Sequence, residues 1–357
     1  MKIKLPKSNK FRILVFVGVF AVIGTAIIIY TRAATSSVSI EAENGQLAGG
    51  ATAFGDTSAS NSAGVLFGST GSTKDYTIKA LSRSLPAAEA SGMIASKQYP
   101  GVFWWHRDGG PATADKPRDA LYAIKLDANG IPQPVRGSDY SPFYMISGAP
   151  NTNWEDIAID ASNNIWIGDI GANTCGGLQD IYRIPEPNPS STATTAPVAH
   201  FTFIFPDPPS GCTTWNSEAM FWLDGKLYIF AKTTNSPVYR IDLPSGNSGQ
   251  ANLVRLGQLA GGVSNISVSS ISSDRKRLLI AGHQNMFVFQ TSSALSGDAL
   301  VKDIISRAPV WKAPFDCNCN LSASVEGGTF VNGSYDVAFV AEGRQIYYGK
   351  PREYGDI

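Results

Sequence analysis

Beyond residue 80, the chain consists of short apolar runs separated by Gly, Pro, Asn, Asp and Ser, a pattern typical of many short strands joined by turns. The runs recur in one order. A strand with an acidic residue comes first, then a strongly apolar or aromatic strand, then a strand that ends in an aromatic-x-aliphatic pattern. Five such units are visible, and they start at Glu89, Glu155, Glu218, Ser270 and Glu326.

These starts are 66, 63, 52 and 56 residues apart, enough for four short antiparallel strands and their loops. A propeller blade has this content. We therefore predict an all-β fold, a β-propeller of five or six blades over residues 83–357, with a β-sandwich as the alternative. The last unit lacks an evident fourth strand, which residues 75–82 could supply to close the ring. Tryptophans within the strands are expected to pack between blades.

The N-terminal region follows a different pattern. Residues 1–12 are basic, and residues 13–31 open with 18 uncharged residues, enough to cross a bilayer as a helix. Five cations precede this stretch, so we predict a single-pass signal-anchor in the cell membrane with a cytoplasmic N-terminus. The bulk of the chain would then be extracytoplasmic. The alternative is a signal peptide cleaved near residues 32–35, which would release a secreted protein.

Residues 32–82 are rich in Ser, Gly, Ala and Thr. Within them, Glu41-Ala42-Glu43 belongs to a segment, residues 36–68, that resembles the opening strands of β-sandwich carbohydrate-binding modules. In such modules these acids often help to hold a structural calcium. The resemblance extends over only about a quarter of a module, so we interpret residues 32–82 as a flexible spacer with fragmentary strands.

The charge balance bears on the partners of the protein, and the cysteine content bears on its disulfides. Lys plus Arg (29) equals Asp plus Glu (29), which argues against nucleic acid as a partner. In an oxidising compartment the cysteines of the main domain are predicted to form two disulfides. A zinc site of four thiolates is the alternative, although the usual C-x-x-C pairs are absent. Cys175–Cys212 is the favoured pair, and other pairings stay open. The four cysteines are Cys175, Cys212, Cys317 and Cys319.

Two motifs stand out, W-E-D-I-A at Trp154 to Ala158 and W-I-G-D-I-G-x-N at Trp166 to Asn173. With weaker matches over about residues 87–348, they resemble a family of exported bacterial β-propeller proteins that is distantly similar to phytase-like and gluconolactonase-like propellers. The resemblance implies a propeller whose channel face holds a ligand. Ala172 stands where G-D-I-G-D-N would have a second Asp, which puts a metal site at that position in doubt.

In a blade, the start of the innermost strand and the end of the next strand lie at the same face, near the central channel. The predicted metal ligands at this rim are Glu89, Glu155, Asp156, Asp169, Glu218 and Glu326. The predicted ligand-binding residues beside them are His106, Asp108, Lys232 and His283. Converging carboxylates favour a bound cation, and oxygen-rich surroundings favour Ca²⁺. The alternative is that the acids are structural and accept hydrogen bonds from the backbone of adjacent blades.

These observations predict a membrane-anchored, monomeric, extracytoplasmic propeller that binds an extracellular ligand or a surface protein at its channel face. The alternative is a divalent-metal-dependent hydrolase of the phytase-like or lactonase-like type. The sequence contains no G-x-S-x-G elbow, H-E-x-x-H pair or phosphate-cradling glycine loop, so it identifies no catalytic residue.

Overall fold

The computed structural model describes residues 52–55, 63–66, 73–109, 111–113, 115–172, 176–234, 236–283, 285–291, 294–315 and 324–354. The chain divides into two compact units, residues 1–72 and residues 73–357. In the first unit, β1 (Thr52–Gly55) pairs antiparallel with β2 (Ala63–Leu66). The predicted membrane span and the Glu41–Glu43 segment lie outside the described residues. Within the described part, no helix is long and apolar enough to cross a membrane.

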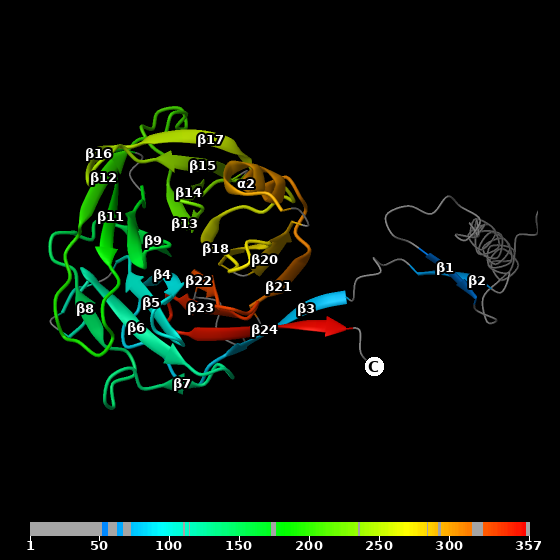
Figure 1. Cartoon of the computed structure of the whole chain (residues 1–357), viewed down its shortest axis with the longest axis horizontal. Helices are drawn as coiled ribbons and strands as arrows, with labels where there is room; N and C mark the ends of the chain where they lie inside the picture. Colours follow the sequence, from blue (N-terminus) through cyan, green and yellow to red (C-terminus); the bar gives the residue numbers. More distant parts are fainter. Residues whose placement is uncertain are drawn as a thin grey trace, which may run out of the picture. The chain divides into compact units, whose positions relative to one another are not determined.

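The second unit is a five-bladed β-propeller, visible as a ring of sheets in Figure 1. Its innermost strands, one from each blade, face one another around the central channel. They are β4 (Ala90–Ala95), β9 (Trp154–Ile159), β13 (Ser217–Leu223), β18 (Ile266–Ile271) and β22 (Val325–Phe330). The second strands are β5 (Val102–Arg107), β10 (Asn164–Asp169), β14 (Lys226–Ala231), β19 (Arg277–Gly282) and β23 (Val337–Ala341).

The outer strands complete each blade. The third strands are β6 (Ala120–Leu126), β11 (Gln179–Pro185), β15 (Pro237–Asp242), β20 (Asn285–Gln290) and β24 (Ile346–Tyr354). Outside them lie β7 (Pro132–Gln133) and β8 (Phe143–Met145), β12 (Ala199–Phe203), β17 (Asn252–Gln258) and β21 (Trp311–Pro314). A short strand, β16 (Ser248–Gln250), pairs in parallel with β12, and helix α2 (Gly297–Ile305) precedes β21.

The ring is closed by a strand from the start of the second unit. β3 (Thr73–Ala80) pairs antiparallel with β24 and becomes the fourth strand of the fifth blade, where the sequence placed residues 75–82. This pairing joins the two ends of the propeller and covers an edge that would otherwise expose unpaired backbone groups. The compact unit therefore begins at Thr73, whereas the sequence assigned residues 32–82 to the spacer.

Blades pack face to face, so each sheet is covered on both sides. The innermost strands β9 and β22 are buried at every residue, and β4, β13 and β18 are buried at all but one. The apolar clusters combine side chains of neighbouring blades. Trp166 of β10 stacks on Trp222 of β13, with 5.5 Å between the ring centroids. Trp104, Trp105 and Trp154 are fully buried. The predicted packing role of the strand tryptophans is therefore confirmed.

A β-bulge recurs near the start of each innermost strand, where one residue has no partner on the second strand. A bulge re-aims the side chain that it carries. The bulged residues are Gly92, Glu155, Glu218, Ser267 and Glu326. The repeat alignment from sequence was thus wrong in two blades, because Gly92 and Ser267, rather than Glu89 and Ser270, are equivalent to the three glutamates.

Candidate functional site

The bulges direct three glutamates toward one mouth of the channel, which we call the acidic mouth. Glu155, Glu218 and Glu326 are 4%, 7% and 4% exposed. The residues that directly follow second strands join them: Lys232 after β14, His283 after β19 and Glu342 after β23. Most of the acidic mouth therefore comes from two positions that repeat from blade to blade.

Hydrogen bonds fix two of the glutamates. Asn153 Nδ2 donates to Glu155 Oε1 over 2.7 Å, and Asn216 Nδ2 donates to Glu218 Oε1 over 3.1 Å. The same Asn-x-Glu arrangement thus occurs in two consecutive blades. Space is tight here, because a Cβ added to Gly171 would lie 1.6 Å from Asn153 Nδ2 and 2.2 Å from Glu155 Oε1. Only glycine fits at that position without displacing the glutamate.

One ammonium group lies among the carboxyl groups. Lys232 Nζ donates a hydrogen bond to Glu218 Oε2. Burial alone would lower the pKa of Lys232, but Glu218, Glu326 and Glu155 outweigh it and raise that pKa. Lys232 therefore stays protonated and is the counter-ion of Glu218 at the acidic mouth.

The remaining negative charge is reduced by protonation. Burial, followed by repulsion from Glu218, raises the pKa of Glu326 to about 8 despite the opposing effect of Lys232. Burial and Glu218 also raise the pKa of Glu155 well above its ordinary value. The mouth thus holds protons near neutral pH that a bound cation could displace.

Three side chains could hold a metal ion together. One ligand atom from each of Glu218, His283 and Glu326 lies within 4.8 Å of the other two. His283 Nε2 is 3.6 Å from Glu326 Oε1, and Glu326 Oε2 is buried without a hydrogen-bond partner among the described residues. Burial and the charge of Lys232 lower the pKa of His283, which favours the neutral imidazole that metals bind.

The other ring nitrogen of His283, Nδ1, has a hydrogen-bond partner, as the non-ligating nitrogen of a metal-binding histidine usually does. His283 Nδ1 lies 2.9 Å from Ser324 Oγ, and either atom could be the donor. If Nδ1–H donates to the serine, Nε2 is left with a free lone pair facing Glu326. Nothing in the sequence pattern singled out Ser324, whereas the repeated Asn-x-Glu spacing could have revealed Asn153 and Asn216.

A second acidic group lies at the same mouth. Burial and the neighbouring Glu89 and Glu342 raise the pKa of Asp108 to about 6. Asp108 Oδ1 has no hydrogen-bond partner within the described part of the chain. The backbone of Glu89 has a positive φ of 61°, and its N–H donates to the Glu342 carbonyl over 3.0 Å. Glu89 is thus held close to Asp108 by the backbone of the fifth blade.

Two predicted metal ligands instead accept hydrogen bonds from backbone amides. Asp156 accepts from Ile157 N at 2.8 Å and, across to the next blade, from Met220 N at 2.6 Å. Asp169 accepts from the backbone N–H groups of residues 152 and 153 at 3.1 and 2.6 Å. These two aspartates thus match the alternative prediction, in which the acids are structural and accept hydrogen bonds from the backbone. They hold the inner strands and their loops in place.

His106 is fully buried rather than exposed at the mouth. A Cβ added to Gly92 would lie 2.3 Å from His106 Nε2, so the ring fills the space beneath the first blade's bulge. Burial lowers the pKa of His106 to about 3, and the ring stays neutral. At the bulge the first blade thus has a glycine with a buried histidine beside it, whereas three other blades have a glutamate at this position.

Of the four cysteines, only Cys212 is among the described residues, and it is disulfide-bonded. Cys175, Cys317 and Cys319 lie outside the described residues. The pairing of Cys212 with Cys175 therefore stays a prediction.

The ring of five sheets defines the chain as a β-propeller protein. No family model matches it, and no curated protein matches its sequence. Similar solved structures include virginiamycin B lyase from Staphylococcus aureus, at 13% identity and a TM-score of 0.34, covering 77% of this chain and 70% of that one. They also include Kuenenia stuttgartiensis hydrazine synthase, at 10% identity and a TM-score of 0.37, covering 73% and 70%.

A catalytically inactive form of the Staphylococcus aureus lyase with quinupristin is similar at 12% identity and a TM-score of 0.36, covering 77% of this chain and 99% of that one. Likenesses this distant carry no argument about function. The motif-based resemblance to exported bacterial propellers stays a prediction.

Proposed function

We propose that this propeller binds a divalent metal ion at its acidic mouth and, through the ion, an external ligand. The observation that supports the proposal most directly is the group formed by Glu218, His283 and Glu326, with a buried carboxyl oxygen that has no partner. Three protein ligands leave coordination positions open for water or for a ligand oxygen.

The ligand set favours a transition metal over the Ca²⁺ that the acids alone suggested. Calcium takes six to eight oxygen ligands, whereas one imidazole with two carboxylates suits Zn²⁺ or Mn²⁺. Lys232 would move away from Glu218 as the ion enters, because two cations cannot share that carboxylate without repulsion. Binding would also release the proton of Glu326, so affinity should rise with pH up to about 8.

Isothermal titration of the full chain with Zn²⁺, Mn²⁺ and Ca²⁺ tests the proposal. We expect saturable binding of Zn²⁺ or Mn²⁺, and a loss of about tenfold or more in His283→Ala and Glu326→Gln. His200→Ala is the matched control, because the His200 side chain is 47% exposed, the His283 side chain is 44% exposed, and each lies beside a carboxylate. Absent binding, or unchanged affinity in both site variants, would refute the proposal.

A metal-dependent hydrolase is the second candidate, and Glu155, which is not one of the three candidate ligands, is the observation that favours it. Burial and the neighbouring Glu218 raise the pKa of this carboxyl group well above its ordinary value, which suits general acid–base chemistry near neutral pH. Hydrolysis of a phosphomonoester or a lactone that needs added metal and is lost in Glu326→Gln would support it. Hydrolysis that survives both Glu326→Gln and Glu155→Gln would exclude this mouth as the active site.

We further propose that residues 13–31 anchor the propeller in the cell membrane, with the acidic mouth outside the cytoplasm. Support comes from the 18 uncharged residues and the five cations before them. The full chain should stay with the membrane fraction after a carbonate wash, and a variant without residues 13–31 should not. A shortened, freely soluble product of the intact gene would favour cleavage instead.

A further inference from the structure

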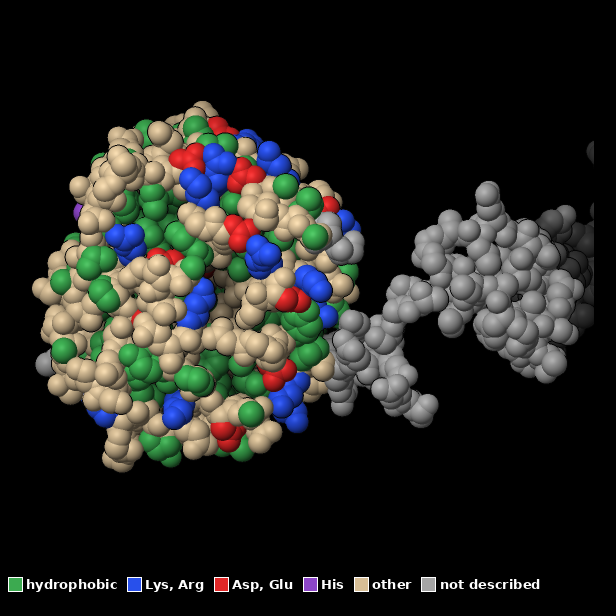
Figure 2. All heavy atoms as spheres, viewed as in Figure 1, with side chains coloured by type: hydrophobic (Ala, Val, Ile, Leu, Met, Phe, Trp, Pro, Cys, Tyr) green, Lys and Arg blue, Asp and Glu red, His purple; other side chains and the backbone are tan. Residues whose placement is uncertain are grey.

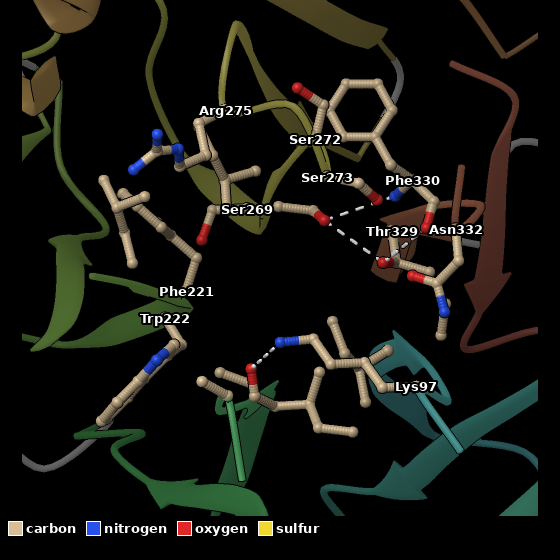
Figure 3. Close-up of a pocket in the computed structure, with 18 of the residues that line it drawn as sticks. Lys97, Phe221, Trp222, Ser269, Ser272, Ser273, Arg275, Thr329, Phe330 and Asn332 are labelled. Atoms are coloured by element: carbon tan, nitrogen blue, oxygen red, sulfur yellow. Dashed lines mark hydrogen bonds between the residues drawn. The ribbon is translucent and has the colours of Figure 1, made fainter. Parts of the chain in front are cut away.

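The inner strands end at a second mouth of the channel, which we call the hydroxyl mouth. A cavity of about 480 Å³ opens there, within the size range of small-molecule sites. Its lining includes Ser269 and Ser270 of β18, Thr329 of β22, Lys97 after β4 and Trp222 of β13 (Figure 3). The space-filling view in Figure 2 shows the ring hollowed at its centre on the face it presents. None of these residues belongs to the acidic mouth.

One hydroxyl group in this cavity is buried and unused. Ser269 is 3% exposed, and its Oγ has no hydrogen-bond partner among the described residues. Its neighbour differs, because Ser270 Oγ lies 3.2 Å from Thr329 Oγ1 and accepts from Phe330 N at 3.3 Å. Leaving a buried hydroxyl unpaired is unfavourable, so Ser269 favours a ligand that supplies the missing partner.

The cavity also has one cation, Lys97, that forms no direct ion pair among the described residues. Burial lowers the pKa of Lys97, and the nearby carboxylates of Asp160 and Glu186 partly offset this effect. Lys97 Nζ points into it in Figure 3 and donates to the carbonyl oxygens of Ile159 and Asp160, at 3.2 and 3.0 Å. An ammonium group has three donors, so one remains for a ligand. Within the described residues, Lys97 forms no ion pair, whereas Arg275 is paired with Asp224 at 3.0 Å. The lining thus carries an excess positive charge at Lys97.

We infer that this cavity binds a small hydroxylated anion, such as a sugar acid or a sugar phosphate. The anionic group lies on Lys97, and a ligand hydroxyl pairs with Ser269 Oγ. The serine and threonine hydroxyls of the lining suit the other hydroxyls of such a ligand, as both donors and acceptors. This inference is independent of the metal binding proposed for the acidic mouth.

Titration calorimetry of the full chain with gluconate, glucose 6-phosphate and glucose tests it. At least one of the two anions should bind, and neutral glucose should bind at least tenfold more weakly. The two anions distinguish a carboxylate from a phosphate as the preferred group. Lys97→Met should weaken anion binding about tenfold or more, and Ser269→Ala should weaken it severalfold. Lys79→Met is the control, because Lys79 is an exposed lysine on the outer strand β3.

Three results would overturn the inference: no binding of either anion, binding of glucose as tight as that of the anions, or anion binding that is unchanged in Lys97→Met. A loss of anion binding in Glu326→Gln with no loss in Lys97→Met would move the ligand to the acidic mouth and would also overturn it. Both cavity variants should keep the wild-type melting temperature within a few degrees, since neither removes a packed apolar group.

Discussion

The two mouths of the channel are built from the same five inner strands, yet they differ in chemistry. At the acidic mouth, bulges present Glu155, Glu218 and Glu326, all nearly buried. At the hydroxyl mouth the strands end without bulges, and the lining is largely apolar. Its hydroxyl groups come from the fourth and fifth blades, and its lysine, Lys97, forms no ion pair among the described residues. The scaffold therefore offers repeated positions, and the residue at each position decides what the mouth can bind.

The two mouths also differ in the free energy that burying their polar groups requires. Buried carboxylates are costly unless they are paired or protonated, and the acidic mouth uses both, through Lys232 and the proton of Glu326. Hydroxyl groups are far cheaper to bury, and most of those at the other mouth find neighbours. Changes at the acidic mouth should therefore affect stability strongly, and changes at the hydroxyl mouth should affect binding with little effect on stability.

The largest expected effect is the pH dependence that Glu326 gives to the acidic mouth. Its pKa is about 8 in the folded protein and 4.5 in the reference state, so between these values the folded chain binds the extra proton. Stability contributed by this group is thus present at low pH and is lost as pH rises through the folded pKa. Relative to Glu326→Gln, the wild type should lose up to about 4 kcal/mol between pH 5 and pH 8.

Urea unfolding of both proteins at several pH values measures this difference. Asp108 also has a raised pKa, but Glu326 is not among the causes of that shift, so Asp108 behaves alike in both proteins. The pKa of Glu155 is raised by burial first and also by Glu326, so the comparison reports Glu326 together with its effect on Glu155. Parallel stability curves for wild type and Glu326→Gln over this range would mean that Glu326 is ionised in the folded protein.

The second prediction compares the two lysines directly. Among the described residues, Lys232 is the one lysine or arginine paired with the buried glutamates of the acidic mouth, so Lys232→Met should cost roughly 3 kcal/mol at pH 7, as breaking a buried ion pair does. Lys97→Met removes an exposed lysine that forms no ion pair within the described part of the chain, and it should cost less than about 1 kcal/mol. Denaturant unfolding at pH 7 gives both values.

The cost of Lys232→Met should also shrink at pH 5, where the glutamates are closer to full protonation and need less compensation. Equal costs for the two lysine variants would show that the acidic mouth does not depend on Lys232 for its charge balance.

The third prediction concerns packing beneath the acidic mouth. Gly171→Ala places a methyl group against Asn153 and Glu155, so it should cost about 2 kcal/mol and push the glutamate out of position. Gly109→Ala is the control, because its nearest neighbour to an added Cβ is Glu89 Oε2 at 3.8 Å, an ordinary contact. Thermal unfolding of both variants is the measurement, and a Gly171→Ala melting temperature equal to that of Gly109→Ala would contradict the geometry.

The sequence predicted the propeller because apolar periodicity and spacing record strand order directly. It also brought Glu155, Glu218, Glu326, Lys232 and His283 to one face, since strand ends within a hairpin must meet. It could not reveal the bulge, because the innermost strands are buried on both faces and have no apolar–polar alternation that an extra residue would interrupt. For this reason Glu89 and Ser270 were aligned with the glutamates in place of Gly92 and Ser267.

Because the bulge could not be predicted, the role of Asp156 was also predicted wrongly from its position beside Glu155. Asp156 follows the bulged Glu155 in sequence, and adjacent residues on a strand point to opposite sides. Asp156 therefore faces the neighbouring blade and Glu155 faces the channel, although the motif presents them as a pair. The hydroxyl mouth escaped prediction because single serines at strand ends have no distinguishing spacing, and only the structure shows which hydroxyl lacks a partner.

The smallest expected effect separates Ser269 from Ser270 at the hydroxyl mouth. Ser269→Ala removes a buried hydroxyl with no described partner, so stability should stay within about 0.5 kcal/mol of wild type or rise slightly. Ser270→Ala breaks contacts with Thr329 and with the backbone of Phe330, and it should cost about 1 kcal/mol. Denaturant unfolding without ligand resolves the two. A loss in Ser269→Ala as large as that in Ser270→Ala would show that Ser269 already has a partner, and the hydroxyl mouth would then lose its unpaired group.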